Sequence, residues 1–337
     1  MTKQRILVTG AAGFLGYHLS RMLASGLDVD LFCVDNFERG ADDVHYRTLI
    51  DRPNVTGLTV DLTREAEVEG LPDDIDIVYH LAALNGTQNF YERPMDVIRA
   101  STLPTILLAE FYGRQTRRPR RFVYAGTSES YASTVSRFGW PVPTAEDVPL
   151  SIDDVTNPRW SYAGSKMHGE IVTAQAGRAY DMPFTIIRYH NAYGPRMGDK
   201  HVVPDFMERM RAGRFELFGH SDTRSFLYVD DSIRATIMVA ESNALANEIV
   251  NIGGEREITM HELGRQMLIA EGIDAEIMLH PSPAGSVKRR APDVSKLKRL
   301  TGFSERVTLA EGLKATADFY LRDHLVERLS VSGTAEI

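Results

Sequence analysis

The first half of the chain alternates between short apolar runs rich in β-branched residues and longer stretches in which apolar residues recur at helical spacing. In the first of these stretches Leu15, Leu19 and Leu23 share one helical face, and Gly26 is placed to end the helix. The alternation predicts an α/β domain in which helices cover both faces of a parallel sheet. The expected strands are residues 5–9, 30–34, 58–60, 75–80, 122–125 and 184–188.

The pattern loosens after residue 190, where loops and short elements replace the regular alternation. Residues 248–252 form one more apolar strand, ended by a pair of glycines, and we expect this strand to return to the first sheet. The sequence thus predicts a doubly wound domain over residues 1–190 and a smaller, interleaved α/β domain over residues 191–328. Residues 329–337 are expected to be a frayed tail.

Composition narrows the class of partner. The chain has 337 residues and a net charge of -8, which argues against nucleic acid or an anionic membrane surface. Five arginines fall within residues 114–121, but no aromatic residues are interleaved with them, so we interpret them as a solvated helix end and loop. Cys33 is the one cysteine, which excludes an intrachain disulfide and a thiolate metal cluster. With no signal peptide pattern at the N-terminus, we expect a soluble, cytoplasmic protein that binds small molecules.

A glycine-rich turn follows the first expected strand and opens the first expected helix. Its glycines are Gly10, Gly13 and Gly16, with Phe14 and Leu15 between the last two. In this context the first glycine permits a tight turn, the second lets the backbone approach a pyrophosphate, and the third lets helix and strand pack closely. The turn therefore predicts a dinucleotide site in a Rossmann-type sheet, with the anion at the helix N-terminus.

The end of the second expected strand supports this site. Asp35, followed by Asn36, lies about 20 residues beyond the turn, where a carboxylate accepts both hydroxyls of the adenosine ribose. A carboxylate there repels a 2′-phosphate, so NAD is favoured over NADP. Arg39 is close enough in sequence to leave NADP as the less favoured alternative.

A tyrosine and a lysine four residues apart form the third element. Tyr162 and Lys166 fall on one face of an expected helix. A lysine charge beside a phenol favours the phenolate, which makes the tyrosine a usable base for a hydroxyl proton. Downstream of a dinucleotide turn, this spacing indicates a catalytic pair.

These motifs together make the chain similar to the extended short-chain dehydrogenase/reductase family, specifically its nucleotide-sugar epimerases, dehydratases and decarboxylases. The similarity runs from about residue 5 to residue 320. The segments that carry it are VTGAAGFLG (8–16), VDNF (34–37), DLT (61–63), HLAA (80–83), TSESY (127–131), YAGSK (162–166), RYHNAYGPRM (188–197), RSFLYVDD (224–231) and RRAPDVSK (289–296).

The resemblance implies roles for particular residues and a homodimer built from helices near residues 95–115 and 160–178. Tyr162 and Lys166 would hold the nicotinamide ribose, and Thr127 would hydrogen-bond the reacting sugar hydroxyl. Further cofactor contacts implied are Asp61, Leu62, Leu81, Ala82, Ala83 and His190. The implied substrate contacts are Ser128, the diphosphate-binding Asn191, Arg224 and Arg290, and Val203 within the base-binding segment 200–206.

The sequence departs from the family pattern at several positions near the reacting centre. Gly126 stands where the family usually has serine, and His190 where an aromatic residue is common beside the nicotinamide. No second histidine lies at ligand spacing from His190, so we expect it to pack against the cofactor and expect no metal site. Residues 133–160 are expected to form the rim of the sugar pocket, and His18 to lie at the surface.

The family members share a first step, in which the tyrosine takes a hydroxyl proton and NAD takes the hydride, leaving a 4-keto sugar. Glu129 is the most informative residue for the fate of that keto sugar, because a 4,6-dehydratase needs a carboxylate base and Thr-Ser-Glu is similar to decarboxylases and GDP-mannose dehydratases. Residues 89–97 also favour a decarboxylase, yet no set of residues demands a substrate carboxylate. A 4-epimerase requires nothing beyond the residues present, so it is favoured over a decarboxylase or dehydratase. A non-catalytic NAD sensor is a remote alternative, since such proteins typically lack the tyrosine or lysine.

Overall fold

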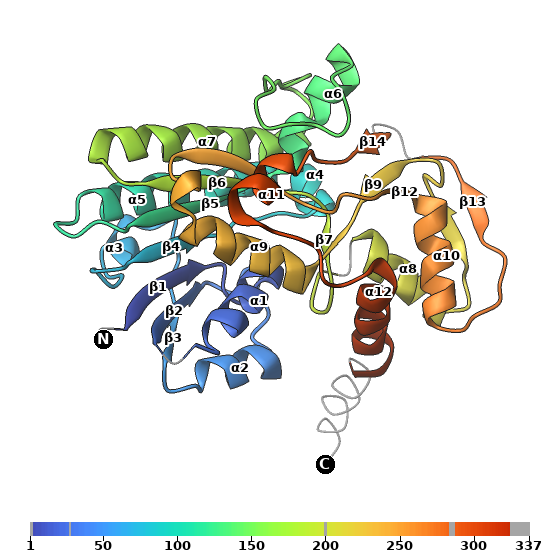
Figure 1. The fold of residues 1–337 in the computed structure, drawn as a ribbon, viewed down its shortest axis with the longest axis horizontal. Coiled ribbons are helices and arrows are strands. Elements are labelled where there is room, and N and C mark those ends of the chain that lie inside the picture. The colour runs from blue at the N-terminus through green and yellow to red at the C-terminus, as the bar shows by residue number, and fades with distance from the viewer. Residues whose placement is uncertain (1–2, 27, 199–200, 283–286, 324–337) are drawn as a thin grey trace.

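The computed structural model describes residues 3–26, 28–198, 201–282 and 287–323. Its largest feature is a seven-stranded sheet with the order β11-β6-β5-β4-β1-β2-β3, in which all neighbouring strands are parallel (Figure 1). This order reverses between β1 and β4, as in a doubly wound dinucleotide-binding sheet. The strands are β1 (Gln4–Thr9), β2 (Val29–Asp35), β3 (Val55–Thr59), β4 (Ile77–His80), β5 (Arg121–Thr127), β6 (Phe184–Tyr189) and β11 (Glu248–Ile252).

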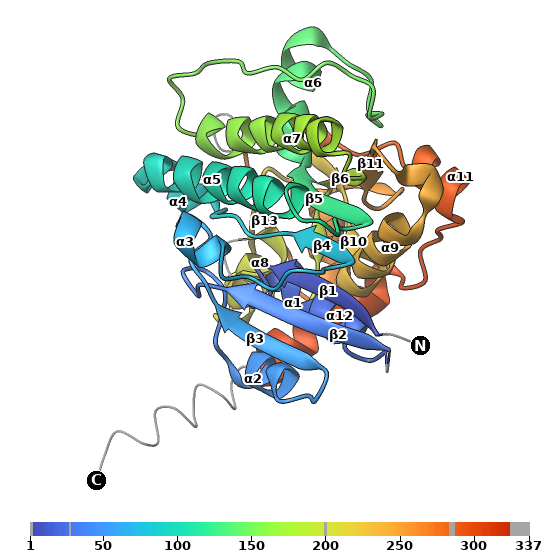
Figure 2. The ribbon, with the colours of Figure 1, turned by 90° about the vertical axis from the view of Figure 1, so that its left-hand side faces the viewer.

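Alternate residues of the central strands pack against helices on opposite faces, as a parallel sheet buried on both sides requires. Ile6 of β1 lies in one core with Leu19 of α1 (Phe14–Leu23) and with residues of α9 (Val229–Glu241). Leu7 lies in a second core with Leu108 of α5 (Pro94–Gly113). Helix α7 (Trp160–Tyr180) lies beside α5 (Figure 2), so the face opposite α1 and α9 carries the predicted catalytic pair.

The remaining elements of the first half connect the strands. They are α2 (Val44–Ile50), α3 (Glu65–Val68), α4 (Thr87–Glu92), the 3-10 helix η1 (Ser128–Tyr131) and α6 (Ala132–Phe138). The C-terminal elements gather to one side of the large sheet (Figure 1) around a core of their own. They are β7 (Ala192–Tyr193), α8 (Val202–Arg211), β8 (Glu216–Phe218), β9 (Thr223–Ser225), β10 (Leu227–Tyr228), β12 (Glu257–Thr259), α10 (Met260–Ala270), β13 (Met278–His280), β14 (Arg289–Arg290), α12 (Leu309–Asp318) and η3 (Phe319–Asp323). Two further elements, η2 (Asn243–Leu245) and α11 (Ser295–Thr301), pack instead against β11 and belong to the core of the large sheet.

The Rossmann-type sheet expected from the sequence is confirmed, and each expected strand is present. The strand expected at 248–252 is β11, which pairs with β6 at the edge of the large sheet. The strand expected at 58–60 is β3, which begins earlier, at Val55. The sequence misplaces its start because β3 is an edge strand in which only Val55 is buried, so that its apolar pattern is weak. The division of the chain at residue 190 stays a prediction, and the expected tail, 329–337, lies outside the described residues.

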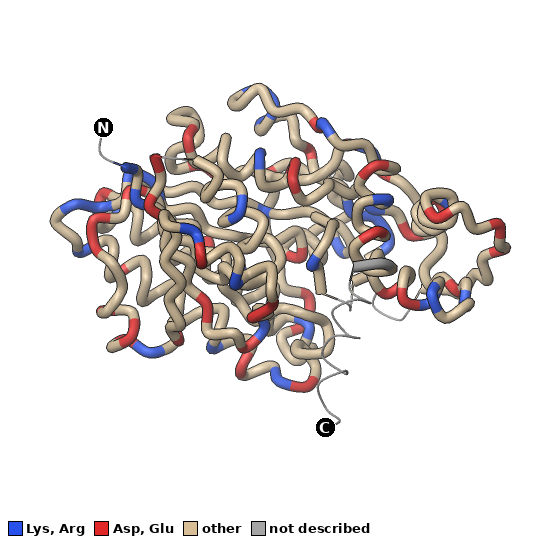
Figure 3. Tube along the Cα trace, turned by 90° about the horizontal axis from the view of Figure 1, so that it is seen from below, with Lys and Arg blue, Asp and Glu red and all other residues tan. Residues whose placement is uncertain are grey.

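The arginine-rich segment 114–121 connects the end of α5 to β5, and its side chains are engaged by the fold. Arg120 binds Glu241 through two hydrogen bonds of 2.8 Å, and Arg121 is buried, donating to Thr185 at 2.8 Å. Figure 3 shows acidic and basic positions interspersed along the trace. This segment is therefore held by intramolecular contacts.

No helix among the described residues combines the length and hydrophobicity needed to cross a bilayer.

The expectation that His18 lies at the surface is wrong. Its side chain is 5% exposed, because the face of α1 that carries it packs against the C-terminal half of the chain. The Nε2 atom lies 2.9 Å from the carbonyl oxygen of Pro195, and burial lowers the pKa of this imidazole to about 4. His18 is therefore a neutral residue of the packing between the two halves.

Candidate active site

A cleft of about 960 Å³ opens at the carboxyl ends of the strands, beside the point where the strand order reverses. Ligands of doubly wound sheets bind at this edge. Its walls come from the loops after β1, β2, β3, β4 and β5, from α7 and from the segment after β6. The predicted site residues that line it are Gly10, Gly13, Phe14, Leu15, Gly16, Asp35, Asn36, Asp61, Leu62, Leu81, Ala82, Ala83, Thr127, Ser128, Glu129, Tyr162, Lys166, Asn191 and Arg290.

The glycine turn has the geometry that a dinucleotide pyrophosphate needs. Gly10 has φ +70, and a Cβ at this position would lie 2.9 Å from the backbone nitrogen of Ala82. A Cβ at Gly16 would lie 2.0 Å from the carbonyl oxygen of Gly10. No side chain caps the N-terminus of α1 at Gly13, so the first N–H groups of this helix face the cleft, where an anion is favoured. These residues fit the pyrophosphate of NAD.

Asp35 is fixed at the end of β2 by the backbone around it. Its Oδ2 accepts a hydrogen bond of 2.9 Å from the N–H of Ala12, and its Oδ1 accepts one of 2.8 Å from the N–H of Phe37. Burial raises the pKa of this carboxyl, and the backbone N–H groups counteract that rise. The carboxylate lines the cleft beside Asn36, as recognition of a ribose requires.

The predicted catalytic residues meet between β5 and α7. Thr127 ends β5, and its hydroxyl hydrogen-bonds the phenol of Tyr162. The Lys166 Nζ donates a hydrogen bond of 2.8 Å to the carbonyl oxygen of Ala125 and lies 6.0 Å from the centre of the Tyr162 ring. The helical spacing of four residues thus brings the ammonium group to the phenol, as the sequence predicts.

Burial and charge act in opposite directions on this pair. Burial raises the pKa of the Tyr162 phenol to about 12, against the charge of Arg39 and the hydrogen bonds from Asn85 and Thr127, which favour the phenolate. Burial lowers the pKa of Lys166 to about 7, while the charge of Glu170 acts in the opposite direction. Burial thus favours the neutral form of both groups, and the nearby charges and hydrogen bonds favour their charged forms.

Glu129 lies between two arginines. It forms ion pairs with Arg159, at 2.6 Å, and with Arg290 of β14. Burial alone would raise the pKa of this carboxyl, but the charges and hydrogen bonds of Arg290 and Arg159 outweigh burial and lower it to about 2. Glu129 is consequently an ionised, fully engaged carboxylate at neutral pH.

Three predicted ligand contacts do not line the cleft. Val203 is buried in the core of the C-terminal elements, because α8 turns this face toward them. Arg224 donates hydrogen bonds to the carbonyl oxygens of Thr223, at 2.7 Å, and Val287, which hold its guanidinium group within the loops. The His190 ring is buried and stacks on Tyr131, with 5.7 Å between the ring centres. Residue 200, in the predicted base-binding segment, lies outside the described residues.

Several lining residues escaped the sequence analysis. Asn85 bonds the Tyr162 phenol, and Phe90 stacks on the same ring at 5.0 Å with an interplanar angle of 12°. Asn85 follows β4, so its position after a strand was a signal for a cleft residue. Arg159 lies one helical turn before Tyr162, but nothing in the sequence shows that it meets Glu129.

Comparisons with known proteins identify the family to which the chain is similar over most of its length. The model of the family described as the NAD dependent epimerase/dehydratase family matches residues 6–253. A UDP-N-acetyl-alpha-D-glucosaminuronate decarboxylase of Bacillus cytotoxicus is 32% identical, over 94% of this chain and 98% of that protein. A UDP-glucose 4-epimerase of Mycolicibacterium smegmatis is 30% identical, over the same shares of the two chains. The structure is also similar to the Bacillus cereus UDP-glucuronic acid 4-epimerase with UDP-glucuronic acid and NAD, with a TM-score of 0.84 and 26% identity over 95% and 99% of the chains.

Proposed function

Because the chain belongs to the NAD dependent epimerase/dehydratase family, we propose that it is a nucleotide-sugar 4-epimerase that uses NAD. The observation that supports this choice is the contrast between two groups in the cleft. The Tyr162 phenol is bonded by Thr127 and lies beside the Lys166 charge, whereas both arginine neighbours of Glu129 keep that carboxylate engaged. This contrast supports Tyr162 as the base for the shared first step, and it disfavours Glu129 as a second base.

In the proposed reaction, Tyr162 as phenolate accepts the proton of the C4 hydroxyl while Thr127 orients that hydroxyl. Lys166 stabilises the phenolate by its charge. Held at the glycine turn and at Asp35, NAD would supply a reversible acceptor for the C4 hydride. Tyr162 then gives the proton back to the oxygen at C4, which restores the starting state of the protein.

Elimination of water is the weaker alternative. A 4,6-dehydratase needs a carboxylate that takes the proton beside the ketone, and a useful base has a pKa near the working pH. The pKa of Glu129 is about 2, because Arg290 and Arg159 hold its charged form. Such a carboxylate is too weak a base for this step.

Decarboxylation is a second candidate, and the same ion pairs favour it. Arg290, which shares Glu129 with Arg159, lines the cleft that holds Tyr162. A carboxylate at C6 of the sugar, or the enolate left after loss of carbon dioxide, is the type of anion that such arginines bind. The 32% identity to a glucosaminuronate decarboxylase supports this candidate.

Mass spectrometry on purified protein in D₂O separates the three reactions. The panel consists of UDP-glucose, UDP-glucuronic acid, UDP-N-acetylglucosaminuronic acid and dTDP-glucose. We expect a product of unchanged mass, without deuterium, that differs from the substrate in chromatographic retention. Loss of carbon dioxide with gain of one deuterium would establish the decarboxylase, and loss of water would establish the dehydratase.

Replacement of Glu129 by glutamine tests its role as an ion-pair partner. Since the pKa of about 2 keeps Glu129 ionised throughout the usual assay range, we expect the acid limb of the pH profile to persist, and to move to lower pH because the Glu129 charge raises the pKa of Tyr162. We expect kcat/KM to fall roughly 10- to 100-fold, because two arginines each lose a charge-assisted partner. Disappearance of the acid limb from the kcat/KM profile of Glu129→Gln would instead identify Glu129 as an acid or base.

We also propose a homodimer through α5 and α7. These adjacent helices carry exposed apolar side chains, namely Met95 at 71%, Ile98 at 38% and Ile171 at 60%. Ile171→Asp is expected to convert the protein to a monomer in light scattering, because a buried charge opposes association. The matched control is Ile269→Asp on α10, where the side chain is 63% exposed, and this variant is expected to stay dimeric. A dimeric Ile171→Asp protein would contradict this interface.

A further inference from the structure

Behind the catalytic helix, a buried ion pair joins α7 to the neighbouring strand. Arg188 of β6 donates to both carboxylate oxygens of Glu170 of α7, at 2.9 and 2.7 Å. The two side chains are only 3% and 7% exposed. Removing two charges from water is costly and is often not repaid by their attraction, so stability alone does not account for such a pair.

Glu170 is placed to act on the catalytic lysine. It follows Lys166 by four residues, so the two side chains lie on the same face of α7, and both residues are buried. The Lys166 ammonium group donates a hydrogen bond to the carbonyl oxygen of Ala125, which carries no charge. Glu170 therefore supplies a negative charge to a lysine whose direct partner is uncharged.

The backbone between Ala125 and Thr127 is shaped around the same carboxylate. A Cβ at Gly126 would lie 3.0 Å from the Oε1 of Glu170. Glycine at this position, where the family usually has serine, thus gives the carboxylate room against β5. Glu170 thus packs against Gly126, which lies in the chain between Ala125, whose carbonyl group holds Lys166, and Thr127.

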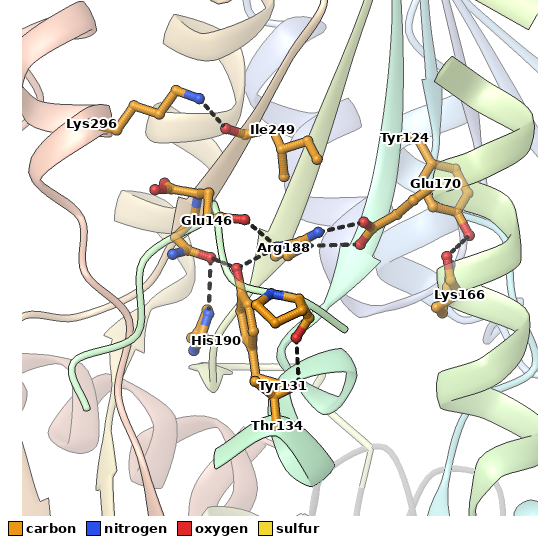
Figure 4. Close-up of polar contacts among 12 residues, drawn as sticks. Tyr124, Tyr131, Thr134, Glu146, Lys166, Glu170, Arg188, His190, Ile249 and Lys296 are labelled. Atoms are coloured by element: carbon orange, nitrogen blue, oxygen red, sulfur yellow. Dashed lines mark hydrogen bonds and ion pairs between the residues drawn. The ribbon is translucent and has the colours of Figure 1, made fainter. Parts of the chain in front are cut away.

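The other side of the pair is fixed by a buried polar network. Arg188 also donates to the Tyr131 hydroxyl at 2.8 Å and to the Glu146 carbonyl oxygen at 3.0 Å, and Tyr131 donates to the Asn251 side chain at 2.9 Å. Figure 4 shows Arg188 between Glu170 on one side and Tyr131 and Glu146 on the other. The carboxylate of Glu170 is consequently held in one orientation.

We propose that Glu170 is a positioning residue for the reaction: held by Arg188, its carboxylate keeps the Lys166 ammonium group charged beside Tyr162. This inference rests on the proposed function only in taking Tyr162 as the base. It holds equally for a decarboxylase, because that reaction begins with the same proton transfer.

The other titratable groups that face Lys166 do not supply this charge. Burial lowers the pKa of His80 on β4 to about 3, and burial raises the pKa of Tyr124 on β5 well above its usual value, so both are neutral at pH 7. On α7 itself, burial raises the pKa of the Tyr162 phenol, and its phenolate is the anion that the Lys166 charge has to stabilise, so Tyr162 does not itself keep Lys166 charged. Arg188 on β6 faces Glu170 and is paired with it. Among the described residues, Glu170 is the anion that acts on Lys166.

The test uses Glu170→Gln in the NAD-loaded protein. We expect the basic limb of the kcat profile to move down by about one pH unit, since Lys166 loses its proton more easily without a nearby anion. At a pH above that limb kcat is expected to fall about tenfold, with KM changed less than about twofold. An NMR titration of the Lys166 side chain, assigned against Lys166→Met, is expected to show the ammonium group losing its proton about one pH unit lower than in the unmodified protein, and this readout requires no substrate.

Three further variants keep the inference testable. Glu170→Asp retains the charge and is expected to recover the basic limb of the unmodified protein. Glu110→Gln is the control, because it removes an exposed glutamate of an ion pair on α5, and it is expected to change neither the kcat profile nor the titration. If Glu170→Gln does not fold, Glu170→Gln/Arg188→Gln leaves no unpaired buried arginine and is expected to show the same shifts. Folded variants with unchanged pH limbs and an unchanged Lys166 titration would overturn the proposal, even where the proposed function holds.

Discussion

Replacing Tyr162 by phenylalanine is expected to lower kcat between roughly 10²- and 10⁴-fold while NAD stays bound. The change removes the one phenol that Thr127 and Asn85 bond in the cleft and that lies beside Lys166. The ring itself stays, so packing against Phe90 is retained and stability should change little. Turnover is measured on the nucleotide sugar that the panel identifies, and bound NAD is measured after denaturation of the purified protein.

Tyr91→Phe is the matched control for this variant. Tyr91 lies on α4 and is 55% exposed, so the loss of its hydroxyl is expected to leave both turnover and NAD content unchanged. Turnover of Tyr162→Phe within about twofold of the unmodified protein would contradict the mechanism, because general base catalysis would then come from another group.

Gly16→Ala is expected to abolish NAD binding and to lower stability by about 1–3 kcal/mol or more. The new Cβ would lie 2.0 Å from the carbonyl oxygen of Gly10 and 2.7 Å from its carbonyl carbon. These are backbone atoms that no side-chain rotation can move, so the turn and the start of α1 must separate. Purified protein is expected to contain no NAD and to unfold at a lower temperature.

Gly26→Ala provides the control, because a Cβ there would meet its nearest atom, the carbonyl oxygen of Leu23, at 3.4 Å. This variant is expected to keep its NAD and its melting temperature. Stoichiometric NAD in Gly16→Ala would contradict the assignment of the turn as the pyrophosphate site.

The features that the sequence predicts well are those encoded over short stretches. The glycine turn, its flanking strand and helix, and Asp35 at the end of β2 follow from apolar periodicity and from residues within one supersecondary unit. The Tyr162 and Lys166 pair is equally local, because four residues of helix fix the two side chains on one face. The ends of strands are predicted less well, as β3 shows by starting at Val55.

Features that depend on contacts distant in the sequence are the ones that it does not predict. Glu129 and Arg290 are 161 residues apart, and their ion pair changes Glu129 from a candidate base to an engaged carboxylate. His18 is buried for a similar reason, since the partner of its ring is Pro195 in the other half of the chain. Tertiary packing decides such burial and charge, and neither has a periodic signal along the chain.

UDP-glucuronic acid that carries deuterium at C4 tests most directly whether the hydride leaves one carbon and returns to it. We expect the product to keep its deuterium at C4, with the configuration at that carbon inverted in the proton NMR spectrum and the mass unchanged. UDP-glucose labelled at C4 serves as the second probe if the uronic acid is not turned over. Release of the label into solvent or into free NADH, or retention of the original configuration with loss of carbon dioxide or water, would contradict the 4-epimerase.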